Sequence, residues 1–112
     1  MSTELESYKS FIDDVVGIKK SAISTWVEKG SFPEVPDNIK RNEILSTLSN
    51  EQRTELAKII QESNESGIHD LLVLLNDNAS IEYKGVKLPK EPFDTDLNFD
   101  FVARSEGDSW PK

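Results

Sequence analysis

Apolar residues recur at helical spacing over the first part of the chain. They follow one another from Tyr8 to Trp26 at intervals of three or four residues, which places them on one side of an α-helix. The pattern predicts a long helix over residues 3–29 that ends at Gly30 and either spans the whole domain or bends near Gly17.

Further amphipathic segments follow after a proline-containing connector. A short helix is expected after Asn38, and Ser49 with Gln52 forms a capping box that opens another helix. We expect this helix to stop at Gly67. Residues 68–75 repeat the i, i+3, i+4, i+7 spacing of Ile and Leu, which predicts one more helix.

The hydrophobic period changes after residue 79. Two short runs flank Lys84-Gly85, a dipeptide typical of a tight β-hairpin. Residues 93–104 then alternate polar and apolar side chains, which predicts a third strand. On that strand, the core side would carry Leu97, Phe99, Phe101 and Ala103.

Together these patterns predict an α+β fold. About four helices would form a layer in residues 3–78, and a small antiparallel sheet of about three strands would lie in residues 80–104. The sheet and the C-terminal segment that follows it together take up residues 80–112. The composition, 36% hydrophobic and 30% charged, is ordinary for a globular protein. A chain of 112 residues is long enough for one hydrophobic core and too short to divide comfortably into two domains. We therefore expect a single domain over residues 1–112.

Composition narrows the range of partners. The formal net charge is −8, so the protein should repel nucleic acids and anionic lipid surfaces. The chain has no cysteine, which excludes a thiolate nucleophile and cysteine-ligated metal centres. No basic apolar leader or membrane-length apolar run occurs, so we expect a cytoplasmic protein that binds neither membranes nor nucleic acids.

The predicted third strand would display a row of carboxylates on its polar face. Asp94, Asp96 and Asp100 share this face with Arg104. The row could be a solvated surface, a guard against pairing at a sheet edge, or an acidic surface that meets a basic protein. Trp110, close to the chain end, would either pack into its own domain or anchor a partner. These five residues are the candidate partner-binding residues.

The same row invites comparison with a calcium-binding loop. Oxygen-bearing side chains occupy positions 1, 3, 5 and 7 of the segment that begins at Asp94. However, Phe99 stands where such a loop needs glycine, and Ser105 where it needs a bidentate glutamate. We therefore predict no metal and no cofactor.

Enzymatic activity has little support in the sequence. His69 is the only histidine, and side chains of neighbouring helix residues point about 100° apart, so Asp70 would not orient it. A structural His-Asp turn at a helix N-terminus, with Asp70 near the positive end of the helix, explains the pair better. The alternative to a binding protein is a small hydrolase or metal-dependent enzyme that uses His69 and Asp70, or the row of Asp94, Asp96 and Asp100.

The favoured function is therefore a non-enzymatic protein-interaction module. Its partner would be a protein, in particular a basic one that the module neutralises or regulates, as an immunity protein or antitoxin does. The broad apolar face of the first helix, with Tyr8, Phe11 and Trp26, would also allow a homodimer.

Several short phrases in the sequence resemble those of a known domain family. They are Gly67-Ile68-His69-Asp70, Leu88-Pro89-Lys90-Glu91-Pro92-Phe93, Asp100-Phe101-Val102-Ala103-Arg104 and Gly107-Asp108-Ser109-Trp110-Pro111. Through these phrases the chain resembles a small uncharacterised bacterial family, a domain of unknown function. The resemblance covers nearly the whole chain. The resemblance implies a bacterial, single-domain cytoplasmic protein and brings no activity and no site residues.

Overall fold

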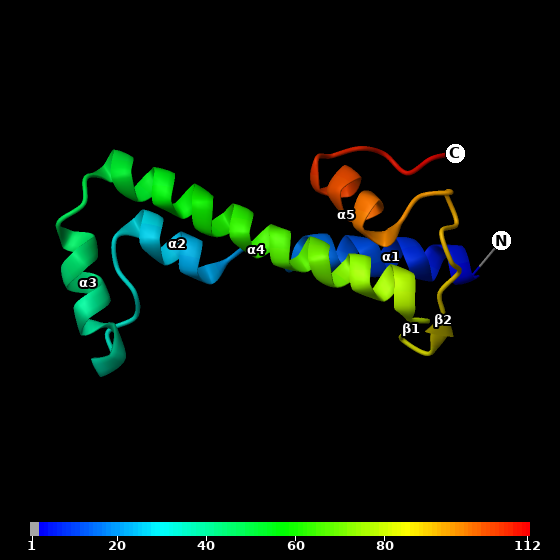
Figure 1. Cartoon of the computed structure of the whole chain (residues 1–112), viewed down its shortest axis with the longest axis horizontal. Coiled ribbons are helices and arrows are strands. Elements are labelled where there is room, and N and C mark those ends of the chain that lie inside the picture. Colours follow the sequence, from blue (N-terminus) through cyan, green and yellow to red (C-terminus); the bar gives the residue numbers. More distant parts are fainter. Residues whose placement is uncertain (1–2) are drawn as a thin grey trace. The chain divides into compact units, whose positions relative to one another are not determined.

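The computed structural model describes residues 3–112 and is mostly helical (Figure 1). Its α-helices are α1 (Thr3–Gly17), α2 (Ala22–Lys29), α3 (Ile39–Ser46), α4 (Asn50–Asn78) and α5 (Leu97–Ser105). A 3-10 turn, Pro36–Asn38, precedes α3, and the two strands are β1 (Glu82–Tyr83) and β2 (Val86–Lys87). The fold divides into two compact units, Met1–Lys19 with Ser66–Lys112 (the terminal unit) and Lys20–Glu65 (the central unit).

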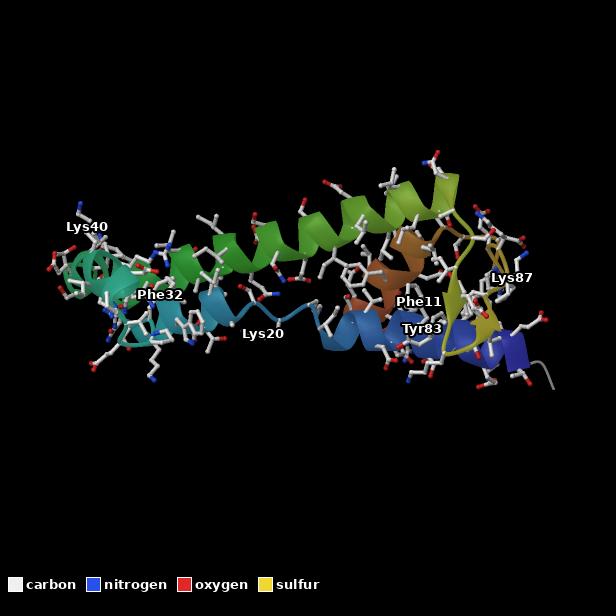
Figure 2. All side chains as sticks on the ribbon, turned by 90° about the horizontal axis from the view of Figure 1, so that it is seen from below. Phe11, Lys20, Phe32, Lys40, Tyr83 and Lys87 are labelled. Carbon is white, nitrogen blue, oxygen red and sulfur yellow. The ribbon has the colours of Figure 1, made fainter. Side chains whose placement is uncertain are left out.

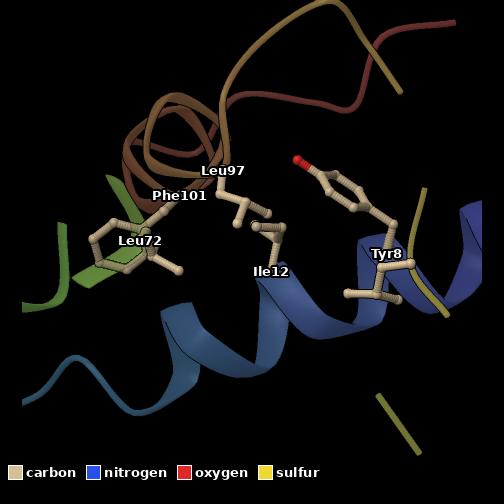
Figure 3. Close-up of a cluster of buried hydrophobic side chains, with 6 residues drawn as sticks. Tyr8, Ile12, Leu72, Leu97 and Phe101 are labelled. Carbon is tan, nitrogen blue, oxygen red and sulfur yellow. The ribbon is translucent and has the colours of Figure 1, made fainter. Parts of the chain in front are cut away.

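The core of the terminal unit lies between α1, α5 and the last turns of α4 (Figure 3). Spacings of four residues place Tyr8 and Ile12 on one side of α1, and Leu97 and Phe101 on one side of α5. Leu72 and Leu88 complete this cluster of buried side chains. Ile12 is completely buried, at 0% exposure, so its side chain is enclosed by the packed residues of the core.

A two-residue turn joins β1 to β2 and confirms the predicted hairpin. The strands pair antiparallel, with Tyr83 opposite Val86. Lys84 and Gly85 both have positive φ, 50° and 82°, which is the geometry that suits a two-residue hairpin. Figure 2 shows Phe11 of α1 close to Tyr83, and the two rings meet edge to face with centroids 5.1 Å apart. The hairpin therefore covers one side of α1.

The central unit has its own small core, made by Val27, Leu45 and Ala57. Ser21 caps α2 by accepting a 3.1 Å hydrogen bond from the backbone N–H of Ser24. The Ser24 hydroxyl in turn donates to the carbonyl of Ala57 at 2.7 Å, which joins α2 to α4 within this unit. The cap and this bond fix α2 on the small core.

The predicted third strand is wrong, because residues 97–105 form helix α5. Leu97, Asp100 and Phe101 are buried, at the i, i+3, i+4 spacing of a helix, whereas Phe99 is 58% exposed. A short run of apolar residues two apart fits either period, so alternation alone could not decide between them. The coarse α+β prediction is confirmed, but the sheet has two strands and not three.

Of the predicted helix boundaries, those near Gly17 and Gly30 agree with the structure and the one at Gly67 does not. The expected helix over residues 3–29 is interrupted after Gly17, where a bend was one of the two predicted alternatives. Its predicted end is confirmed, because α2 ends at Lys29 and Gly30 is its C-cap, with a left-handed φ of 98°. The predicted stop at Gly67 is wrong, because α4 continues to Asn78. A glycine inside a helix costs only about 1 kcal/mol relative to alanine, which is too little to end a helix by itself. The single domain over residues 1–112 stays a prediction.

Shortening the side chain of Ile12 should destabilise the terminal unit strongly. We expect Ile12→Ala to lower the free energy of unfolding by about 2–5 kcal/mol, because it leaves a cavity in a closely packed core. Ile18→Ala is the matched control, since Ile18 is 73% exposed and should cost below about 0.5 kcal/mol. Urea denaturation followed by circular dichroism measures both; equal losses would contradict the assignment of the core.

Candidate functional site

A buried carboxylate, that of Asp100, lies between α1 and α5. The residue is 5% exposed, and its two oxygens accept hydrogen bonds from two neutral hydroxyls. Tyr8 of α1 donates to Oδ2, and Thr95 donates to Oδ1 at 2.5 Å. Burial, followed by the hydrogen bond to Asp100, raises the pKa of Tyr8 above its usual range. Tyr8 therefore keeps its proton at neutral pH and acts as the donor.

The position of Asp100 follows from the start of α5. Asp96 occupies the N-cap position with extended backbone, and its carbonyl accepts from the backbone N–H of Asp100 at 3.0 Å. Asp100 thus lies in the first turn, where the positive end of the helix dipole favours a negative charge. The expectation that Asp100 is displayed on an open strand face is wrong, because the helical period turns it toward α1.

Arg104, in the last turn of α5, holds the C-terminal segment, residues 106–112, in place. Its Nε and Nη2 donate to the two carboxylate oxygens of Asp13 at 2.9 and 3.2 Å, and Nη1 donates to the carbonyl of Asp108 at 2.8 Å. The guanidinium lies 4.8 Å from the ring centroid of Trp110. Trp110 also stacks on Phe93, with ring centroids 5.4 Å apart. Arg104 and Trp110 therefore hold the segment against its own unit.

A cavity of about 140 Å³ lies between α5 and this segment. Its wall includes the aromatic residues Phe93, Phe99 and Trp110, the side chain of Thr95, and the charged residues Asp100 and Arg104. Three of the five candidate residues from the sequence, Asp100, Arg104 and Trp110, thus come together around one space.

The remaining two candidates, Asp94 and Asp96, lie at an exposed acidic surface beside the start of α5. With Asp77 and Glu91 they form what we call the acidic rim. The side-chain amide of Asn76 donates to Glu91 at 3.0 Å and to Asp96 at 3.5 Å, which holds these two carboxylates near each other. Desolvation, and then the neighbouring charge of Glu91, raises the pKa of the Asp96 carboxyl. Like charges are therefore crowded at the rim.

Sequence reasoning missed three residues on which the site depends, namely Tyr8, Thr95 and Asp13. Tyr8 is far in sequence from its partner Asp100, and Asp13 is far from its partner Arg104, so no local pattern connects the members of either pair. One signal could have identified the helix that positions the site. A capping residue precedes the apolar run at Leu97, and a cation stands in the last turn, as at many helix ends.

The other candidate pair, His69 and Asp70, lies on α4. Their side chains approach to 3.3 Å between Nδ1 and Oδ1, and Asp70 is exposed. Over residues 3–112 no group of three or more histidine, cysteine or acidic side chains is arranged to hold a metal ion. Within the same residues, every helix is too short or too polar to cross a membrane.

Comparison with known proteins identifies a family for the chain but no function. A family model described as "Family of unknown function (DUF6547)" matches residues 1–112, so the chain belongs to this family. The resemblance to an uncharacterised domain family is thereby confirmed. No curated protein and no solved structure matches the chain.

Removing the Tyr8 hydroxyl should cost more stability than removing the equivalent hydroxyl at the surface. Tyr8→Phe leaves a buried carboxylate with one donor fewer, and we expect a loss of about 1–3 kcal/mol in the free energy of unfolding. Tyr83→Phe is the matched control, because Tyr83 donates to Asp14, an exposed residue. Its loss should be much smaller in the same urea titration. A larger loss at Tyr83 would show that the buried carboxylate does not organise the unit.

Neutralising Asp96 should stabilise the protein at neutral pH. A raised pKa in the folded state means that the charged carboxyl is disfavoured there, so the cost is present at pH 7 and disappears as pH falls toward 3.8. Asp96→Asn keeps a good N-cap residue, and we expect a higher urea midpoint at pH 7 and a gain that shrinks on acidification. Asp70→Asn is the control and should give no such gain. A lower midpoint for Asp96→Asn at pH 7 would contradict the crowding of charge.

Proposed function

For this member of a family of unknown function, we propose a role as a non-enzymatic protein-interaction module that binds a basic partner protein at the acidic rim. The observation that carries the proposal is the raised pKa of the exposed Asp96 carboxyl, which follows first from desolvation and then from the neighbouring charges of Glu91 and Asp77. An exposed arrangement that disfavours its own charge would be relieved by lysine or arginine side chains of a partner.

The charges around the rim support the choice of a basic partner. The nearest cation in sequence, Lys90, is already used, because its ammonium donates to the carbonyls of Asn76 and Ala79 at 3.1 and 2.6 Å. Within residues 3–112 no ion pair joins a lysine or arginine to the rim. With a net charge of −8, the protein would attract a basic partner over a distance and raise its rate of association.

Exposed apolar side chains next to the rim would supply contact area. Phe99 and Val102 are three residues apart on α5, and both are exposed large hydrophobic residues. An aromatic anchor surrounded by charged groups is a common arrangement at protein interfaces. Phe99 and Val102 lie on α5, and Asp96 of the acidic rim is the N-cap of the same helix.

The alternative of a small hydrolase or metal-dependent enzyme has less support. Asp100 and Arg104 are engaged in bonds that hold α5 and the C-terminal segment in place. Among the side chains of residues 3–112, His69 is bonded only to the adjacent Asp70, on the surface of α4. A role in neutralising or regulating the partner would follow if the bound surface of that partner were its own functional site.

Charge reversal at the rim tests this proposal. We expect the tagged wild-type chain to capture a basic protein from native lysate, and Asp94→Lys/Asp96→Lys to lose it. The control Glu28→Lys/Glu62→Lys changes the net charge equally at exposed positions of the central unit and should retain the partner. Capture by the wild type should also weaken as salt rises from about 0.05 to about 0.5 M, since the Debye length shortens.

Circular dichroism of all variants verifies that they are folded. If both double variants lose the partner equally, net charge and not the rim is responsible. If the rim variant retains it, the proposed surface is wrong.

A further inference from the structure

We propose that the cavity between α5 and the C-terminal segment binds an organic ammonium group, with Asp100 as its anionic partner and the aromatic walls as its apolar enclosure. The cavity measures about 140 Å³ and has Phe93, Phe99 and Trp110 in its wall. This inference goes beyond the partner-binding role, because it rests on the cavity and not on the acidic rim.

The first support is that, among the described residues, no cationic side chain pairs with Asp100. The residue is 5% exposed, and both of its donors, Tyr8 and Thr95, are neutral hydroxyls. In the described part of the chain no lysine, arginine or histidine is hydrogen bonded to it. A buried carboxylate without a cation is unfavourable, and it offers about four lone-pair directions, of which two are used here. A cationic ligand would occupy the remainder.

The second support is the chemistry of the walls. Aromatic rings attract organic cations through their faces, most strongly where water is excluded. The rings of Phe93 and Trp110 stack with their centroids 5.4 Å apart and form one wall of the cavity. Phe99 is 58% exposed and contacts no other aromatic ring within residues 3–112. A cavity of about 150 Å³ holds a molecule the size of benzene, so a short alkylammonium group would fit.

Arg104 also lines the cavity, but it does not favour an anionic ligand. Its nitrogens donate to Asp13 and to the carbonyl of Asp108, and the Asp13 carboxylate compensates its charge. An anion would therefore find few free donors and would meet the charge of Asp100. The ammonium group could belong to a small amine or to a lysine side chain of a partner, and both sources share this chemistry.

Titration with three probes of similar size and different charge tests the proposal. In a Trp26→Phe background Trp110 is the only tryptophan, so its fluorescence reports on the cavity directly. We expect n-butylammonium to bind with a dissociation constant on the order of 1 mM. 1-Butanol and butyrate should bind at least about tenfold more weakly, because they lack the positive charge.

Two variants separate the two contributions. Asp100→Asn should weaken n-butylammonium binding about tenfold or more, and Phe99→Ala about threefold. Leu74→Ala, an exposed position on α4 outside the cavity, should leave binding unchanged. If Asp100→Asn does not fold, the comparison of Phe99→Ala with Leu74→Ala still shows whether n-butylammonium binds in the cavity.

A lysine with both backbone ends blocked distinguishes the sources. Binding as tight as that of n-butylammonium assigns the ammonium group to a partner side chain, and binding of the free amine alone assigns it to a small molecule. The proposal is overturned if butanol or butyrate binds as well as n-butylammonium, if n-butylammonium leaves Trp110 unchanged, or if Phe99→Ala binds like Leu74→Ala. None of these results depends on the capture experiment with the rim variants.

Discussion

The burial of one carboxylate, that of Asp100, constrains the whole terminal unit. Burying a charged group is costly unless its oxygens receive hydrogen bonds, and Tyr8 and Thr95 supply them. This requirement sets the rotation of α5 against α1, which then turns Leu97 and Phe101 into the core. Arg104, one turn further along the same helix, makes a second connection to α1 through Asp13. Two polar connections thus fix the orientation that the apolar contacts alone would leave less specific.

That orientation gives the charged residues of α5 different environments. Asp96 at the N-cap stays exposed among other carboxylates, Asp100 is buried among hydroxyls and aromatic rings, and Arg104 is compensated by Asp13. Helix position, and not residue type, decides which of these groups is free to meet another molecule. The acidic rim and the aromatic cavity are therefore two products of the same helix, one at its start and one along its side.

The apolar pattern was sufficient for much of the fold. The helical part and the hairpin at Lys84-Gly85 could be read from periodicity and turn chemistry, because these are local properties. The third strand failed because Leu97, Phe99 and Phe101 satisfy a period of two over a stretch too short to exclude a helix. The site itself was recognised only as a set of residues. Its geometry depends on Tyr8 and Asp13, which reach α5 only through tertiary packing.

The order of the two units along the chain has a kinetic consequence. The central unit is one continuous stretch, Lys20–Glu65, whereas the terminal unit is assembled from segments on either side of it. Contacts between residues distant in sequence pay a large loop-closure entropy before they are formed, so they form slowly. During synthesis the central unit can complete its core while α1 waits, with Tyr8 unpaired, until α5 has left the ribosome. Helix α5 thus completes the folding of α1, which is made before it.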